Sequence, residues 1–197
     1  MGETLDVSVI SHKVDILEAL IYTIKTYVGG ITNEKVSIMD NWMYKNVVEQ
    51  KSLLEAQKYV DDKIIFYEAE NDNVAIGCFV ERIRDYYSIE GWINPKQEID
   101  KNKYIEFLNF WKEYFKEDKE FDSCAIGKET SINYDHGIYE AIKTSSDVDL
   151  WIIKKTIVSA VKLKKIINKN TRITPNVILI DDIFKHFAAD CEENSIT

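Results

Sequence analysis

Residues 85–142 constrain the fold more than any other part of the chain, because they change periodicity three times. The β-branched and aromatic stretch YYSIEGWIN is followed by KYIEFLNFWKEYF, in which apolar residues recur at helical spacing. The apolar stretch SCAIG and the segment GIYEAI come next. This order of strand, helix, strand and helix predicts a βαβ crossover.

The long helix predicted inside this segment carries one apolar stripe opposite a face of Lys and Glu. The stripe consists of Tyr104, Phe107, Leu108, Trp111 and Phe115. An amphipathic helix of this kind buries its apolar side against the rest of the domain, so we expect Trp111 to anchor the core. The surplus of aromatic residues nearby can also mark a ligand cleft or a partner surface, but core packing is the favoured interpretation.

The N-terminal part of the chain predicts a strand, two helical regions and an antiparallel meander. A hairpin is indicated by the turn sequence ENDN between two β-branched stretches, and Pro95 ends the strand that follows it. Gly29 and Gly30 provide a stop for the first helix. The predicted elements are a strand at 5–12, a helix at 14–28, mostly helix at 34–60 with room for a break near 37–40, and strands at 63–69, 74–80 and 86–93.

The C-terminal part gives a less uniform pattern. Residues 156–168 fit either a helix or a continued strand, because their apolar residues are in register with both. The other elements predicted here are a short strand at 123–126, a short helix at 134–142, strands at 148–153 and 177–180, a loop at 171–175 and a helix at 181–189.

Composition favours a single folded domain in a reducing compartment. The chain has 197 residues, of which 45% are hydrophobic, enough to fill one core. No apolar stretch reaches the ~20 residues of a membrane span, and the first residues do not form a signal peptide. Cys78, Cys124 and Cys191 form no CxxC pair. We therefore expect a cytoplasmic protein.

The charge pattern bears on the kind of partner. A net charge of −9 makes general affinity for nucleic acid or an anionic membrane unlikely on electrostatic grounds. One segment, between Asp149 and Asp181, contains no acidic residue. Its cations form either a solvated basic face or a docking surface for an acidic partner. The candidate partner-binding residues are Lys154, Lys155, Lys162, Lys164 and Lys165.

The order of elements resembles that of the GNAT acyltransferase family. The hairpin FYEAENDNVAIGCFV resembles the family's second and third strands, IEGWINPK resembles its fourth strand, and GIYEAI resembles its tyrosine-bearing helix. The resemblance implies an α/β (α+β) fold with a mixed, largely antiparallel sheet flanked by helices. It covers residues 1–157 and leaves residues 158–197 as a C-terminal extension packed on the same domain.

The resemblance also implies where a catalytic site would lie. In that family, acyl-CoA lies between the fourth and fifth strands, where the fourth strand splays away. On this pattern Glu90 would be the general base for the acceptor amine, and Tyr139 would be the acid near the leaving thiolate. Without catalysis, Glu90 is a solvent-facing strand residue and Tyr139 a half-buried helix tyrosine. The residues that would contact acyl-CoA are Trp92, Ile93, Asn94, Gln97 and Asn102.

One departure from the family pattern concerns the phosphate-binding loop. The family has a glycine-rich loop there, whose bare N–H groups bind pyrophosphate at a helix N-terminus. Residues 97–102 read QEIDKN, with no glycine and two carboxylates. We therefore expect acetyl-CoA to bind weakly or not at all, and no cofactor is assigned.

Two functions follow from these observations. The favoured one is a non-catalytic binding protein on a GNAT-like scaffold, such as an immunity protein, a phage-encoded inhibitor or a virion component, acting through contacts with another protein. The alternative is an acyl-CoA-dependent N-acyltransferase with an atypical phosphate loop. The Lys-, Ile- and Asn-rich usage suggests an AT-rich bacterial or phage genome. His186 and Asp182 can share a helix face, but two ligands do not make a metal site.

Overall fold

The computed structural model describes residues 3–116, 120–130, 132, 134, 136–145, 147–159, 162–163 and 170–181. The strands are β1 Leu5–Ser11, β2 Asn33–Met39, β3 Val48–Gln50, β4 Ile64–Glu70, β5 Val74–Ile83, β6 Tyr86–Pro95, β7 Ser123–Lys128, β8 Val148–Lys154, β9 Asn170–Ile173 and β10 Val177–Asp181. The helices are α1 Ile16–Val28, α2 Leu53–Gln57, α3 Lys101–Lys116 and α4 Ile138–Thr144.

All ten strands belong to one sheet, with the order β3-β2-β4-β5-β6-β1-β7-β8-β10-β9. Every neighbouring pair is antiparallel. The prediction of a mixed α/β fold with a largely antiparallel sheet is therefore confirmed, while the GNAT resemblance stays a prediction.

Strand β1 lies at the centre of the sheet, between β6 and β7. It pairs antiparallel with both, so β6 and β7 run parallel to each other with one strand between them. This is the crossover that residues 85–142 predict, and α3 makes the connection. The gap that the family resemblance implies for acyl-CoA, between these same two strands, is occupied by the hydrogen-bonded backbone of β1.

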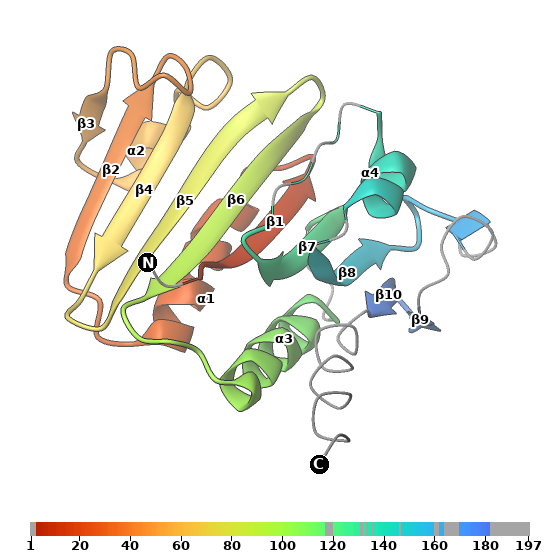
Figure 1. Ribbon diagram of the computed structural model, residues 1–197. Coiled ribbons are helices and arrows are strands. Elements are labelled where there is room, and N and C mark those ends of the chain that lie inside the picture. Colours follow the sequence, from red (N-terminus) through yellow and green to blue (C-terminus); the bar gives the residue numbers. More distant parts are fainter. Residues whose placement is uncertain are drawn as a thin grey trace.

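The two faces of the sheet are covered differently. Helices α1 and α3 pack on one face, where their buried residues form a single apolar cluster with those of eight strands, and α2 joins it through Ala56. Helix α4 packs on the opposite face and covers β7, β8 and β10. On that second face no helix within the described part of the chain covers β2, β4, β5 and β6, which lie toward the viewer in Figure 1. We call this exposed area the open face.

Helix α3 confirms the predicted apolar stripe. Tyr104, Phe107, Leu108, Trp111 and Phe115 are all buried. Two polar contacts add to this packing, because the Tyr104 hydroxyl donates to the Asp149 carboxylate of β8, and Lys112 pairs with Asp181 of β10. Helix α3 is thereby tied to the last strands of the sheet.

The prediction of helix over residues 34–60 is wrong for most of its length. Residues 33–39 form β2, in which Val36 and Ile38 face the core and the backbone pairs with β4. Only α2, which Ser52 caps by accepting from the Glu55 N–H, is helical. Pairing with β4 overrides the helical spacing, because a strand neighbour satisfies the whole backbone ladder of these residues.

The C-terminal segment contributes to the same sheet. Strand β10 pairs with β8 and with β9, so residues 170–181 extend the sheet at its edge. The loop predicted at 171–175 is wrong in part, since β9 includes Thr171 to Ile173. The helix predicted at 181–189, most of residues 156–168, and Cys191 lie outside the described residues. None of the helices in the described ranges is long and apolar enough to cross a membrane.

Candidate functional site: the open sheet face and the Glu90 cavity

The open face is best described by one line of residues that crosses the sheet. Paired residues of neighbouring strands point to the same side, so strand register defines which side chains share a face. The line that passes through the middle of the open face continues beneath α4. From β2 to β10 it contains Ser37, Phe66, Phe79, Glu90, Ser8, Ala125, Trp151 and Ile180.

Four aromatic side chains cluster on the open face. Phe66 and Phe79 stack with their ring centroids 4.6 Å apart and an interplanar angle of 16°. Trp42, from the loop after β2, packs on Phe79 at 4.8 Å, and Tyr44 approaches the edge of Phe66 at 6.5 Å. Trp42 and Tyr44 remain exposed, by 44% and 56%. We call these four residues the aromatic cluster.

Trp92 adds a further apolar side chain to this face. It lies in the line of paired residues next to the one that contains Glu90. It is paired with Gly77 on β5 and with Asp6 on β1. A Cβ atom at Gly77 would lie 2.1 Å from the Trp92 ring, so the ring occupies the space above Gly77. A glycine is therefore required at this position for the indole to lie against the sheet.

A small cavity opens beside Trp92, with a volume of about 120 Å³. We call it the Glu90 cavity. Its walls come from β1, β5, β6 and the segment after β7. Its lining residues are Asp6, Val7, Ser8, Phe79, Glu90, Gly91, Trp92, Thr130 and Ile132.

Two carboxylates of this cavity have a raised pKa. Burial is the main cause for Glu90, and the nearby charges of Glu81 and Asp6 raise its pKa further. Burial also raises the pKa of Asp6, although hydrogen bonds from the Thr130 N–H at 2.6 Å and the Thr4 hydroxyl act in the opposite direction. Among the described residues, no Lys, Arg or His side chain lines the cavity beside these two carboxyl groups, so burial and like charge act on them without a neighbouring cation.

Three hydroxyl groups at or next to this cavity are buried without a hydrogen-bond partner in the described structure: Ser8 Oγ, Thr130 Oγ1 and Tyr134 Oη. Ser8 and Thr130 line the cavity, and the Tyr134 hydroxyl lies next to the hydroxyls of Ser8 and Ser123. Buried polar groups normally have partners, so these hydroxyls are available to a bound group or to water.

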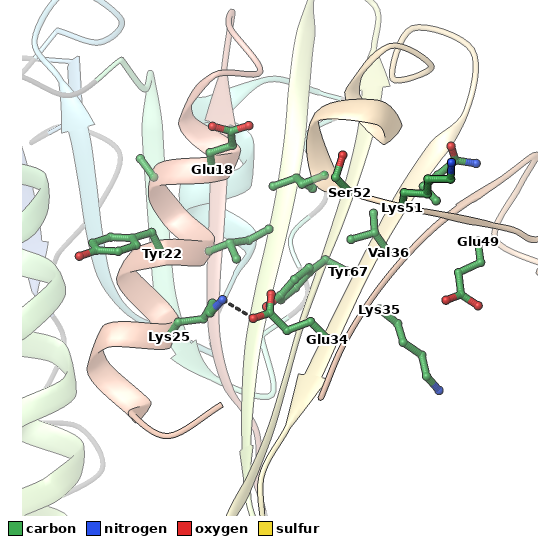
Figure 2. A pocket seen from close by; sticks show the side chains of 14 residues that line it. Glu18, Tyr22, Lys25, Glu34, Lys35, Val36, Glu49, Lys51, Ser52 and Tyr67 are labelled. Atoms are coloured by element: carbon green, nitrogen blue, oxygen red, sulfur yellow. Dashed lines mark hydrogen bonds and ion pairs between the residues drawn. The ribbon is translucent and has the colours of Figure 1, made fainter. Parts of the chain in front are cut away.

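A larger cavity lies elsewhere, on the helix-covered side between α1 and the β2–α2 region (Figure 2). Its volume is about 810 Å³. Inside it, Lys25 pairs with Glu34, and the Tyr67 hydroxyl donates to Glu34 at 3.0 Å. The hydrogen bond from Lys25 lowers the pKa of Glu34, whereas burial and the Glu34 charge raise that of Tyr67. These polar groups satisfy one another, which leaves this cavity without a clear ligand preference.

The two catalytic candidates do not share a cavity. Glu90 lies on β6 and lines the Glu90 cavity, whereas Tyr139 lies on α4 and is not part of its lining. The Tyr139 hydroxyl accepts a hydrogen bond from the Ser159 N–H at 2.8 Å, and the Lys162 ammonium lies 4.1 Å from the centre of its ring. Tyr139 thus has a structural role at the contact between α4 and the segment after β8.

The residues proposed to contact acyl-CoA are divided between different surfaces. Trp92 and Asn94 belong to the open side of β6, and Asn102 lies in the first turn of α3. Ile93 and Gln97 line a third cavity, of about 520 Å³, between the end of α1 and the start of α3. The structure therefore does not bring the five residues together into one site.

The acidic loop before α3 also has a structural explanation. The Asp100 carboxylate accepts a hydrogen bond from the Lys103 N–H at 3.0 Å, as an N-cap residue does. One of the two carboxylates of residues 97–102 therefore occupies the helix terminus at which the family would bind phosphate.

The candidate basic surface is described only in part. Lys154 ends β8, where its ammonium lies 5.6 Å from the centre of the Phe121 ring, and Lys155 follows it. Lys162 is exposed and contacts Tyr139. Lys164 and Lys165 lie outside the described residues. The proposal that this segment binds an acidic partner stays a prediction.

Metal binding was considered across residues 3–181 as far as they are described. There, no group of three or more His, Cys, Asp or Glu side chains is arranged to hold a metal ion. Asp182 and His186 lie outside the described residues.

Comparison of the chain with protein-family models, with curated proteins and with solved structures finds no match.

Sequence reasoning missed most of the open face, although a signal was present. In β5, Val74, Ile76, Cys78 and Val80 alternate toward the core. The alternate positions would be expected to be polar or small, yet Phe79 is among them. The signal for this surface is an aromatic residue at a solvent-side position in each of two paired strands, Phe66 in β4 and Phe79 in β5. Asp6, Ser8 and Thr130 gave no comparable signal, because only the fold brings them together.

Proposed function

We propose that this chain is a non-catalytic binding protein that contacts another protein through its open sheet face. The observation that carries the proposal is the aromatic cluster, in which the exposed rings of Trp42 and Tyr44 pack on the half-buried pair Phe66 and Phe79. Exposed aromatic residues grouped in one patch are typical of interaction surfaces. The GNAT-like order of elements and a cytoplasmic location are parts of the same proposal, and the buried free thiols of Cys78 and Cys124 support the latter.

The charge around the aromatic cluster specifies the partner. Acidic side chains surround it, and Glu81 accepts a hydrogen bond from the Trp42 indole at 2.9 Å. Lys35 pairs with Glu68 at 3.8 Å on this face, and Lys63 pairs with Asp40 at the loop that carries Trp42 and Tyr44. A partner with a basic surface complements this arrangement and would associate faster at low salt. The acidic residues of the face are Asp6, Glu68, Glu70, Glu81 and Glu90.

The test compares two variants with the parent protein in quantitative capture from the native host, followed by calorimetry with the purified partner. Phe66→Ser/Phe79→Ser removes the stacked pair of the open face. Tyr22→Ser is the matched control, since Tyr22 is 72% exposed on α1, on the opposite side of the sheet. We expect the double variant to lose at least 100-fold in affinity, about 2.7 kcal/mol, and the control to bind as the parent does.

Circular dichroism and thermal melts establish that the double variant is folded before binding is compared. Equal binding by the parent and the folded double variant would remove the open face from the functional account. A partner whose binding Tyr22→Ser abolishes would instead assign the interface to the α1 side.

The alternative function, an acyl-CoA-dependent N-acyltransferase, is tested separately by calorimetry with acetyl-CoA at low salt. We expect weak or no binding, because Asp100 caps α3 and β1 fills the space between β6 and β7. Micromolar affinity would return the enzyme to first place and would make Glu90 the first residue to substitute.

A further inference from the structure

The Glu90 cavity differs from the other cavities in its charge. Two of its lining residues are carboxylates, Asp6 and Glu90, and none is Lys, Arg or His. Within the described part of the chain neither carboxylate forms an ion pair with a cation. In the larger cavity between α1 and β2, by contrast, Glu34 is paired with Lys25. The Glu90 cavity thus lacks the positive group that its carboxylates would stabilise.

Its shape and its remaining polar atoms indicate what kind of group fits. The side chains of Phe79 and Trp92 form apolar aromatic walls, and the volume of about 120 Å³ equals that of roughly four water molecules at ~30 Å³ each. The Ser8 side chain is 6% exposed, and its hydroxyl lacks a hydrogen-bond partner. The Thr130 hydroxyl, also buried, lacks one as well. These atoms can accept hydrogen bonds from a donor held between the two carboxylates.

Cationic side chains have the required combination of properties. Guanidinium and ammonium groups donate several hydrogen bonds, accept none, and are attracted to the faces of aromatic rings. A divalent metal ion is a poorer fit, because only two carboxylates converge here and hard cations take six or more oxygen ligands.

We infer that the Glu90 cavity receives a positively charged side chain, arginine or lysine, of the basic partner that docks on the open face. This inference rests on the proposed function, and it names the anchor of that interface. Glu90 and Asp6 balance the charge, Ser8 and Thr130 accept hydrogen bonds, and Trp92 packs against the aliphatic stem. The anchor would lie beside the aromatic cluster, because Glu90 is paired directly with Phe79.

The inference can be tested without knowing the partner, using single capped amino acids as probes. N-acetyl-arginine amide and N-acetyl-lysine amide are titrated into the ¹⁵N-labelled protein at low salt, with N-acetyl-citrulline amide as the uncharged isostere of arginine. We expect millimolar, saturable shifts of the Gly91 amide and the Trp92 indole N–H for at least one cation, and at least tenfold weaker binding of citrulline.

Two variants with the same change in net charge sharpen the test. Glu90→Gln should weaken binding of the cation at least tenfold. Glu98→Gln, an exposed glutamate outside this cavity, should leave it unchanged. Affinity should also fall as the pH is lowered through the raised pKa values of Asp6 and Glu90, because the protonated carboxyls lose their charge.

Equal binding of citrulline, or unchanged binding to Glu90→Gln, would overturn the inference. The inference would also be overturned if low-millimolar calcium displaced the cationic probe and produced the same NMR shifts, because that result would identify a metal site. Failure here differs from failure of the proposed function. If Glu90→Gln retains the captured partner while Phe66→Ser/Phe79→Ser loses it, the open face is the interface but the Glu90 cavity is not its anchor.

Discussion

A single line of paired residues crosses two halves of this sheet that have different surroundings. In the half formed by β7, β8 and β10, Ala125, Trp151 and Ile180 are buried beneath α4 and its neighbours. In the half formed by β4 and β5, Phe66 and Phe79 lie on the same face with no helix above them. The same face of one sheet is therefore core on one side of β1 and surface on the other.

This difference can be read in the strand sequences. Where both faces are covered, β8 and β10 are nearly continuous apolar stretches, as strands buried on both sides are. Where one face is open, β4 and β5 alternate, with buried and partly exposed positions in turn. Phe66 and Phe79 occupy two of the partly exposed positions, where this pattern favours polar residues, and they are paired with each other. Trp42 and Tyr44 of the same chain pack on them and are themselves exposed, and exposed aromatic groups of this kind are typical of a partner surface.

The largest expected effect is the loss of stability on Trp111→Ala. Trp111 is fully buried in α3, so its removal leaves a cavity and should cost ~3–5 kcal/mol in the free energy of unfolding, measured by denaturant melts. Trp42→Ala is the comparison from the open half and should cost ~1 kcal/mol or less, because Trp42 is 44% exposed. Similar losses for both would show that the aromatic cluster is structural.

The second effect concerns the ion pair between α3 and β10. Lys112 Nζ lies 3.1 Å from Asp181 Oδ2, and both side chains are almost buried. Lys112→Met should therefore cost on the order of 3 kcal/mol, because it leaves a nearly buried carboxylate without its cation. Lys13→Met, which breaks an exposed pair with Glu120, should cost less than ~1 kcal/mol. If Lys112→Met cost less than ~1 kcal/mol as well, water or another group would have replaced the lysine beside Asp181.

A smaller effect is expected at Gly77, where the open half leaves room for adjustment. Gly77→Ala places a Cβ where the Trp92 ring lies, so the ring must move toward solvent, at a cost of ~1 kcal/mol. The movement should be visible in tryptophan fluorescence. In a Trp92→Ala background, Gly77→Ala should have almost no effect on the free energy of unfolding. An undiminished loss of stability in that background would show that the strain lies in the β5 backbone and not in the contact with Trp92.

The smallest effect is a change in the pH dependence of stability. The pKa of Glu90 is raised in the folded protein, so the folded state binds its proton more tightly and stability falls as the pH rises from the ordinary value of 4.5 through the raised one. Glu90→Gln should therefore be as stable as the parent or more so at pH 7, by roughly 0.5 kcal/mol or less. The two melting curves should converge below the ordinary pKa, and a variant that is less stable only at neutral pH would contradict the assignment.

The sequence predicted the elements whose patterns are strong and local. Strand β1, helix α1 with its glycine stop, the hairpin of β4 and β5, and helix α3 lie where periodicity and turn residues place them. The helix prediction for residues 34–60 failed because their apolar spacing also fits a strand. That strand pairs with β4, which is not its neighbour in the sequence. The candidate site was predicted only through Glu90 and Trp92, two of the strand residues that the resemblance singled out.

What the sequence by itself determined is the set of faces: which residues of each helix and strand are apolar, and so which side each must bury. The order of strands was decided by the tertiary structure. It placed the first strand between β6 and β7, and so brought Asp6 and Ser8 beside Glu90 from more than 80 positions away. The physical reason is that periodicity is a property of neighbours along the chain, whereas a cavity is formed by neighbours in space, whose choice depends on the packing of the whole sheet.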